Sequence, residues 1–139
     1  MKKIYVGCAI TNIPEKKDFA SSIAELKNEL RKAGFEILEF MSVLKEKPTY
    51  EEIYIHDIRN SIEHADAMLA ILDHPSTGMG YELATAIEKC GIPVLVVANE
   101  ESSPSRLIMG IQHPKFKFMR YKNFNDISKI FINFVSSKL

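Results

Sequence analysis

Short segments of strand-like and helix-like hydrophobic periodicity alternate along almost the whole 139-residue chain. Several of the strand-like segments, such as residues 67–72 and 92–98, are apolar at nearly every position instead of every second one. Strands that are apolar on both faces are typical of parallel sheets covered by helices on both sides. The alternation therefore predicts an α/β protein with a parallel sheet at its centre.

Hydrophobic periodicity and turn residues locate the expected elements. Strands are expected at residues 3–9, 35–41, 67–72, 92–98 and 115–121, the last as a half-exposed edge strand. Helices are expected at residues 18–33, 81–90, 106–111 and 125–137, and after a capping box at Thr49, with Ile55, Ile58 and Ile62 turned inward. This series fits a flavodoxin-like (Rossmann-like), doubly wound five-stranded parallel sheet better than a barrel, which needs about 200 residues. We therefore expect residues 1–139 to form a single domain of this kind.

The charge and composition of the chain exclude several classes of protein. Eighteen basic side chains balance eighteen acidic ones, whereas proteins that bind nucleic-acid polymers or anionic membranes carry a basic excess. No apolar run approaches the roughly 18 residues of a membrane-spanning helix, and the N-terminus lacks a signal-peptide cleavage region. Cys8 and Cys90 do not form a CxxC motif, which favours a reducing compartment. We expect a cytoplasmic enzyme or binding domain without a nucleic-acid or membrane partner.

The predicted topology also indicates where a ligand binds. In doubly wound sheets, ligands lie beyond the carboxyl ends of the strands at the point where the strand order reverses, here between the first and third strands. The turns at residues 7–11 and 73–82 are therefore expected to face each other across a crevice.

The turn after the third strand carries the most informative residues in the chain. Gly78 and Gly80 allow a ligand to approach the backbone, and the amides of this turn point at the crevice. Glu82 follows in the first turns of the expected helix, where the helix dipole favours an ionised carboxylate. A positioned, ionised carboxylate is what a glycosidic nucleophile requires. A purely structural role for Glu82 at a helix N-terminus is an equally open interpretation.

The remaining polar residues give weaker signals. Asp57, beside His56 at an expected helix start on the same rim, is a candidate second carboxylate, although a solvated helix acid fits as well. Asp66 is expected to be structural. The four histidines show no metal-binding spacing, so we expect neither a metal nor a cofactor. Cys8 lacks the arginine of a phosphatase loop and is expected to be a small apolar residue.

The string Pro75-Ser76-Thr77-Gly78-Met79-Gly80-Tyr81-Glu82 resembles a motif of the nucleoside 2-deoxyribosyltransferase superfamily, in particular of its 2'-deoxynucleoside 5'-phosphate N-hydrolases. The strongest similarity runs from Ile53-Tyr54 to Glu88, and weaker similarity extends from Tyr5 to about Ile111.

This resemblance implies a flavodoxin-like fold, a homodimer, and cleavage of the bond between a sugar C1' and a nucleobase nitrogen. Glu82 matches the glutamate that attacks C1', and Tyr5 matches a tyrosine that holds this carboxylate. Asp57 is similar to an aspartate that assists the leaving base or the water. Ser76 matches a phosphate-binding serine, and Ser105 matches a serine that the partner subunit lends to the phosphate site.

The chain departs from the family pattern at three places. Ala9 and Thr11 stand where the family has a serine and an arginine that bind phosphate, and Phe40 replaces a histidine of the base pocket. Asp57 stands nine residues before Asp66, one more than the resemblance implies. Arg106 could supply the missing charge from across the dimer; otherwise the substrate is a free nucleoside. The expected substrate-binding residues are Gly7, Ala9, Thr11, Phe40, Asp73, Ser76, Gly78, Gly80, Ser105 and Arg106.

The leading hypothesis is an N-glycosidase that acts on nucleoside 5'-monophosphates, 2'-deoxy ones in particular, through a covalent intermediate on Glu82. A deoxyribosyltransferase that passes the sugar to a second base is the first alternative. A non-catalytic nucleotide sensor on the same fold is the second.

Overall fold

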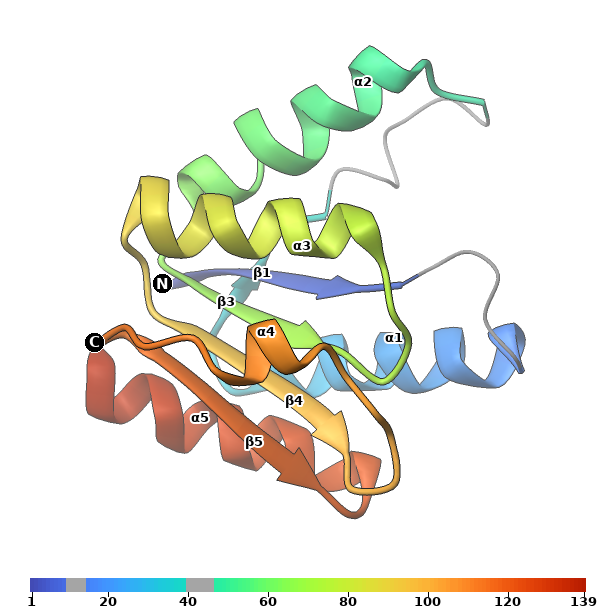
Figure 1. Ribbon diagram of the computed structural model, residues 1–139, viewed down its shortest axis with the longest axis vertical. Coiled ribbons are helices and arrows are strands. Elements are labelled where there is room, and N and C mark those ends of the chain that lie inside the picture. The colour runs from blue at the N-terminus through green and yellow to red at the C-terminus, as the bar shows by residue number, and fades with distance from the viewer. Residues whose placement is uncertain (10–14, 40–46) are drawn as a thin grey trace.

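The computed structural model describes residues 1–9, 15–39 and 47–139. In these residues five strands pair in parallel, in the order β2-β1-β3-β4-β5 (Figure 1). The strands are β1 (Lys3–Cys8), β2 (Glu36–Ile37), β3 (Ala67–Ile71), β4 (Val94–Asn99) and β5 (Phe116–Tyr121). The order reverses between β1 and β3, so the flavodoxin-like topology and its predicted switch point are confirmed.

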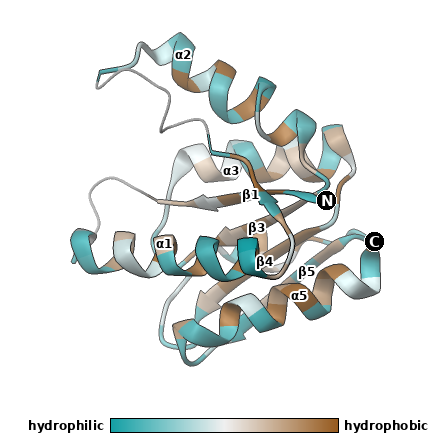
Figure 2. Ribbon diagram, turned by 180° about the vertical axis from the view of Figure 1, so that it is seen from behind, coloured by the Kyte–Doolittle hydropathy of each residue, from teal (hydrophilic) through white to brown (hydrophobic). Residues whose placement is uncertain are grey.

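Helices cover both faces of the sheet. The helices α1 (Lys16–Lys32) and α5 (Ile127–Lys138) lie on one face, which Figure 2 shows from that side. The other face carries α2 (Tyr50–Tyr54), α3 (Thr77–Ala84) and α4 (Arg106–Met109). Further helical turns are the π-helical segments Ile55–Arg59 and Thr85–Cys90 and the 3₁₀ segments Ile62–His64 and Phe124–Asp126. Among the helices described, none combines the length and the apolar character needed to cross a membrane.

The sheet separates two hydrophobic clusters. All five residues of β3 are fully buried, as expected for a central strand covered on both faces. Side chains of α1 and α5 form one cluster, and side chains of α3 and the segment before β3 form the other. Ile58 and Ile62 belong to the second cluster, as predicted, but Ile55 is 38% exposed. That prediction assumed regular α-helical spacing, whereas Ile55 begins a π-helical turn.

The helix after β3 begins earlier than the sequence predicts. We expected it to start at residue 81, but α3 starts at Thr77, because the Ser76 side chain caps it by accepting a hydrogen bond from the Met79 amide. Gly78 and Gly80 therefore lie within the helix and not in a turn before it. Of residues 35–39, the described part of the predicted second strand, only Glu36–Ile37 form β2, and residues 40–41 lie outside the described residues.

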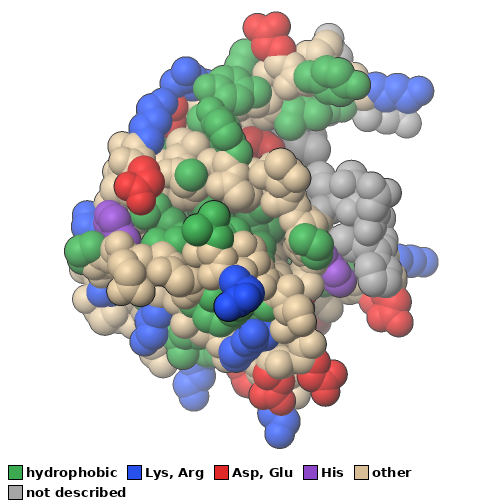
Figure 3. Space-filling view, viewed as in Figure 1, with side chains coloured by type: hydrophobic (Ala, Val, Ile, Leu, Met, Phe, Trp, Pro, Cys, Tyr) green, Lys and Arg blue, Asp and Glu red, His purple; other side chains and the backbone are tan. Residues whose placement is uncertain are grey.

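The face with α2, α3 and α4 carries exposed apolar side chains. Figure 3 shows hydrophobic side chains at the surface of this face, including over α2. Away from the chain ends, the large exposed apolar residues of the described chain are Tyr50, Tyr54, Ile55, Tyr81 and Leu107. The rings of Tyr54 and Tyr81 contact each other, with centroids 6.3 Å apart. We call this set of five residues the apolar face.

Candidate active site

The central feature of the site is a hydrogen bond between β1 and α3. The Tyr5 hydroxyl donates to Glu82 Oε2 over 2.5 Å. Both side chains are partly buried, and they lie 77 positions apart in the sequence. Because β1 and β3 are neighbours and α3 follows β3, the fold brings the two predicted residues together at the switch point.

Gly7 lies beside the second oxygen of the Glu82 carboxylate. A Cβ on Gly7 would be 3.5 Å from Glu82 Oε1 and 3.0 Å from Met68 Cε. A larger side chain would therefore fill the space in front of Oε1. Because residue 7 is a glycine, this space beside Oε1 holds no side chain from β1, while the Tyr5 hydroxyl donates to the other oxygen.

Burial sets the protonation of Glu82. It raises the pKa of Glu82 to about 7, with a smaller contribution from the negative charge of Asp57, while the hydrogen bond from Tyr5 acts in the opposite direction. Burial also raises the pKa of the Tyr5 hydroxyl, which therefore stays a donor. The sequence predicted an ionised carboxylate favoured by the helix dipole, but Glu82 is the sixth residue of α3, beyond the first turn where the dipole acts.

Asp57 lies near Tyr5 and Glu82. Its charge influences both Tyr5 and Glu82, so the three groups are electrostatic neighbours. Burial raises the pKa of Asp57 itself. The predicted position at a helix start is wrong, because Asp57 lies in the π-helical turn Ile55–Arg59, eight residues after the capping box begins at Thr49.

The π-helical turn has its own hydrogen bonds. The Asn60 amide donates to Ile55 O over 2.9 Å, and the buried Ser61 hydroxyl donates to His56 O over 2.6 Å. Such a turn takes up one residue more than an α-helical turn. The spacing from Asp57 to Asp66 is likewise one residue longer than the resemblance implies.

Ser76 and the glycines after it form the first turn of α3. The amide of Met79 donates to Ser76 Oγ, and that of Gly80 donates to Ser76 O, both over 3.3 Å. The predicted anion-binding amides are thus divided. Those of Met79 and Gly80 serve the helix itself, and those of Thr77 and Gly78 stand at its N-terminus.

Asp73, predicted to bind substrate, is bonded within the protein. Its Oδ1 accepts a hydrogen bond from the Asn99 amide over 2.9 Å, and its Oδ2 accepts one from the Tyr121 hydroxyl. Sequence reasoning did not single out Asn99 or Tyr121, and no local pattern could have done so, because they lie 26 and 48 residues further along the chain.

The other predicted substrate residues lie further apart. Ser105 caps α4 by accepting a hydrogen bond from the Ile108 amide over 3.4 Å, and both Ser105 and Arg106 are exposed. Ala9 is buried directly after β1. Thr11 and Phe40 lie outside the described residues.

Other candidate functional groups have structural surroundings. In the described part of the chain, no three His, Cys, Asp or Glu side chains gather as metal ligands do. Both cysteines are free thiols, and burial raises the pKa of Cys8. Asp66 accepts a hydrogen bond from the Lys3 amide over 2.7 Å, in keeping with its predicted structural role.

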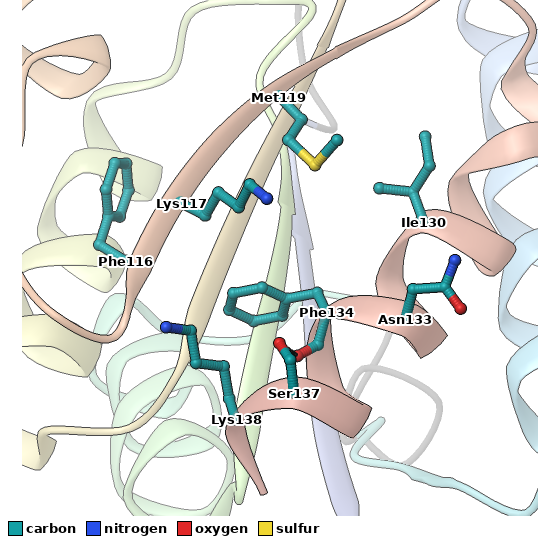
Figure 4. A pocket seen from close by; sticks show the side chains of 8 residues that line it. All are labelled: Phe116, Lys117, Met119, Ile130, Asn133, Phe134, Ser137 and Lys138. Carbon is teal, nitrogen blue, oxygen red and sulfur yellow. Dashed lines mark hydrogen bonds between the residues drawn. The ribbon is translucent and has the colours of Figure 1, made fainter.

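A groove of about 330 Å³ lies between β5 and α5 (Figure 4). Its lining includes Lys117 on β5 and Phe134 and Lys138 on α5. The helix α5 covers the opposite face of the sheet from α3, which carries Glu82. The groove is therefore separate from the candidate site.

Known proteins with similar sequences share one name. The chain is 30% identical over 112 residues to a protein of Methanosarcina mazei named "Putative 2'-deoxynucleoside 5'-phosphate N-hydrolase 1", a stretch that covers 76% of this chain and 68% of that protein. A protein of the same name from Methanococcoides burtonii is 33% identical over 87 residues, which covers 58% of this chain and 70% of that protein. No family model matches the chain.

Solved structures support the fold. The Clostridium botulinum CMP N-glycosidase BcmB superposes with a TM-score of 0.75 over 96% of this chain and 99% of that chain, at 16% identity. A conserved protein of Enterococcus faecalis superposes with a TM-score of 0.63 over 100% of this chain and 99% of that chain, also at 16% identity. At this identity the likeness establishes a shared architecture.

Proposed function

Because the chain belongs to the family of the 2'-deoxynucleoside 5'-phosphate N-hydrolases, we propose that it cleaves the bond between base and sugar in nucleoside 5'-monophosphates, 2'-deoxy ones in particular. The observation that carries this proposal is the Glu82 carboxylate, held by Tyr5 beside Gly7 at the switch point of the sheet. A 2'-deoxy sugar lacks an electron-withdrawing hydroxyl, so its oxocarbenium-like transition state forms more easily.

The proposed reaction has two steps on one carboxylate. Glu82 Oε1 attacks C1' of the sugar, the bond from C1' to the base nitrogen breaks, and its electron pair leaves with the base. Asp57 acts as the general acid in this step and gives a proton to the departing base. Water then adds to C1', Asp57 takes a proton from it, and Glu82 is released. The sugar phosphate keeps its anomeric configuration.

Chromatography of nucleosides and nucleotides after incubation with the protein tests this proposal. We expect free base and sugar phosphate from a deoxynucleoside monophosphate. Exchange of the base in the presence of a second free base would instead indicate a deoxyribosyltransferase. Unchanged ligand that raises the melting temperature would indicate a sensor and contradict the proposal.

The pH dependence of kcat/KM should follow the ionisation of Glu82. Since the nucleophile must be ionised and its pKa is about 7, activity should rise as the pH increases through about 7. Tyr5→Phe removes a hydrogen bond that lowers this pKa, so the acid limb should move to higher pH. Asp57→Asn removes a negative charge that raises the pKa of Glu82. The acid limb of this variant's remaining activity should therefore move to lower pH.

Matched pH–rate profiles of the two variants and wild type check this prediction. Tyr50→Phe, which removes the hydroxyl of a tyrosine that is 94% exposed on α2, is the control and should leave the profile unchanged. Acid limbs that move in the same direction in both site variants would contradict the assignment.

Phosphate recognition is proposed to rest on Ser76, the amides of Thr77 and Gly78, Ser105 and Arg106. The amides at the start of α3 suit an anion, and the Ser76 hydroxyl that caps this helix retains a proton to donate. Ser105 and Arg106 are exposed at the start of α4, a position from which they can enter a neighbouring subunit.

Arg106→Ala should therefore weaken kcat/KM for monophosphates by roughly 1.5–3 kcal/mol, the range for a charged hydrogen bond. Free nucleosides should be nearly unaffected. Steady-state kinetics with paired substrates, such as a deoxynucleoside and its monophosphate, measure the difference. Equal use of both substrates by wild type, unchanged in the variant, would mean that the protein has no phosphate site.

A homodimer is proposed to complete this site. The apolar face lies on the α2, α3 and α4 side of the sheet and includes Leu107, which is 83% exposed directly after Arg106. Burial of such side chains against a second copy would remove them from water and bring Ser105 and Arg106 to the neighbour. Sedimentation should give a dimer, and a fully active monomer would refute this part of the proposal.

A further inference from the structure

Four residues outside the proposed chemistry connect the carboxyl ends of three neighbouring strands. Asp73 follows β3, Asn99 ends β4, and Arg120 and Tyr121 end β5. The Asp73 carboxylate accepts hydrogen bonds from the Asn99 amide and the Tyr121 hydroxyl. We call this set the Asp73 brace.

Arg120 extends the brace into the loop after β4. Its Nη1 donates to Asn99 O over 2.9 Å and to Ser102 O over 2.6 Å, and its Nη2 lies 3.8 Å from the sulfur of Met109 at the end of α4. The Ser102 hydroxyl also donates to Asn99 O over 2.7 Å. Arg120 therefore contacts both ends of the segment that contains Ser105.

We propose that the Asp73 brace is a positioning device for phosphate recognition, which holds both the turn that carries Ser76 in its own subunit's site and the loop that presents Ser105 to the neighbouring subunit's site. This inference rests on the proposed function. Asp73 stands three residues before Ser76, and its carboxylate ties that turn to β4 and β5. In the proposed dimer each phosphate is bound by Ser76 of one subunit and Ser105 of the other, so both segments have to be held within a fraction of an ångström in every subunit.

The same contacts argue against Asp73 as a direct phosphate ligand. Both of its carboxylate oxygens accept hydrogen bonds from the protein, and a carboxylate beside a phosphate would repel it. Tyr121 is 5% exposed, and its hydroxyl is bonded to Asp73. Its effect on a ligand must therefore pass through Asp73.

Arg120→Met and Lys117→Met form a matched pair that tests the inference. Both remove one exposed cation from β5, but Lys117 lines the groove with α5 on the other face of the sheet. For Arg120→Met we expect KM for a deoxynucleoside monophosphate to rise roughly tenfold, with kcat and the KM for the free deoxynucleoside within about twofold of wild type. Lys117→Met should change none of these values.

Tyr121→Phe keeps the buried ring and removes only its hydroxyl, so it separates positioning from direct contact. It should raise KM for the monophosphate selectively, as Arg120→Met does. If kcat/KM falls equally for both substrates and in proportion to a lower melting temperature, the brace has only a structural role and the inference is overturned. An unchanged KM in both variants would overturn it as well. Wild-type protein that cleaves neither substrate would refute the proposed function, and this inference with it.

Discussion

Replacement of Glu82 by Gln is expected to lower kcat by at least about a thousandfold, because the amide cannot form the covalent bond to C1'. The fold and nucleotide binding should remain largely intact, since Gln has nearly the shape of Glu and can still accept a hydrogen bond from Tyr5. Single-turnover kinetics and a binding measurement on the same preparation separate the two effects.

Glu88→Gln is the matched control for this substitution. Glu88 lies six residues further along the same helical stretch and is exposed, so its replacement should leave kcat unchanged. Mass spectrometry of a slowly turned-over substrate should find the sugar on Glu82. Turnover of Glu82→Gln within about tenfold of wild type, or a sugar adduct on another residue, would contradict the assignment.

The same substitution is expected to stabilise the protein at alkaline pH. The folded-state pKa of Glu82, about 7, lies above its ordinary value of 4.5, so the folded protein holds this proton more tightly than the unfolded chain does. The resulting contribution to stability is fully present below about pH 4.5 and is lost as the pH rises through 7. The difference between the two pKa values corresponds to about 3 kcal/mol.

Urea unfolding of wild type and Glu82→Gln at pH 5 and pH 8 measures this effect. The free energy of unfolding of the variant, relative to wild type, should be higher at pH 8 than at pH 5 by up to about 3 kcal/mol. Glu88→Gln, measured at the same two pH values, controls for the loss of an exposed carboxylate from the same helical stretch. If the free energies of unfolding of variant and wild type differ by the same amount at both pH values, burial of ionised Glu82 does not destabilise the folded protein.

The sheet was predictable because its signal is local and repeated. Runs such as 67–72 and 92–98 are apolar throughout, which indicates strands covered on both faces, and the switch point follows from the strand order. The start of α3 was not predictable in the same way. Gly78 and Gly80 favour a turn by propensity, but the Ser76 cap and the packing of Met79 in the core outweigh that preference.

The candidate site was predictable only in part. The glycine-rich turn and Glu82 stand next to each other in the sequence, so position alone made Glu82 a candidate nucleophile, with a structural role equally open. Tyr5 was assigned through family resemblance, because nothing in a short apolar strand marks one tyrosine as a carboxylate partner. The contacts of Asp73 with Asn99 and Tyr121 depend on tertiary structure, and sequence reasoning missed them.

The hydrogen bond from Tyr5 to Glu82 also links function to the cooperativity of folding. Tyr5 lies on β1, a strand in the interior of the sheet, and Glu82 is synthesised 77 residues later. A contact of such high sequence separation forms only after a large loop has closed, so it belongs to the complete native topology and not to an early local structure. Catalytic competence should therefore arrive late in folding and vanish together with the sheet, which makes enzymatic activity a reporter of global rather than local unfolding.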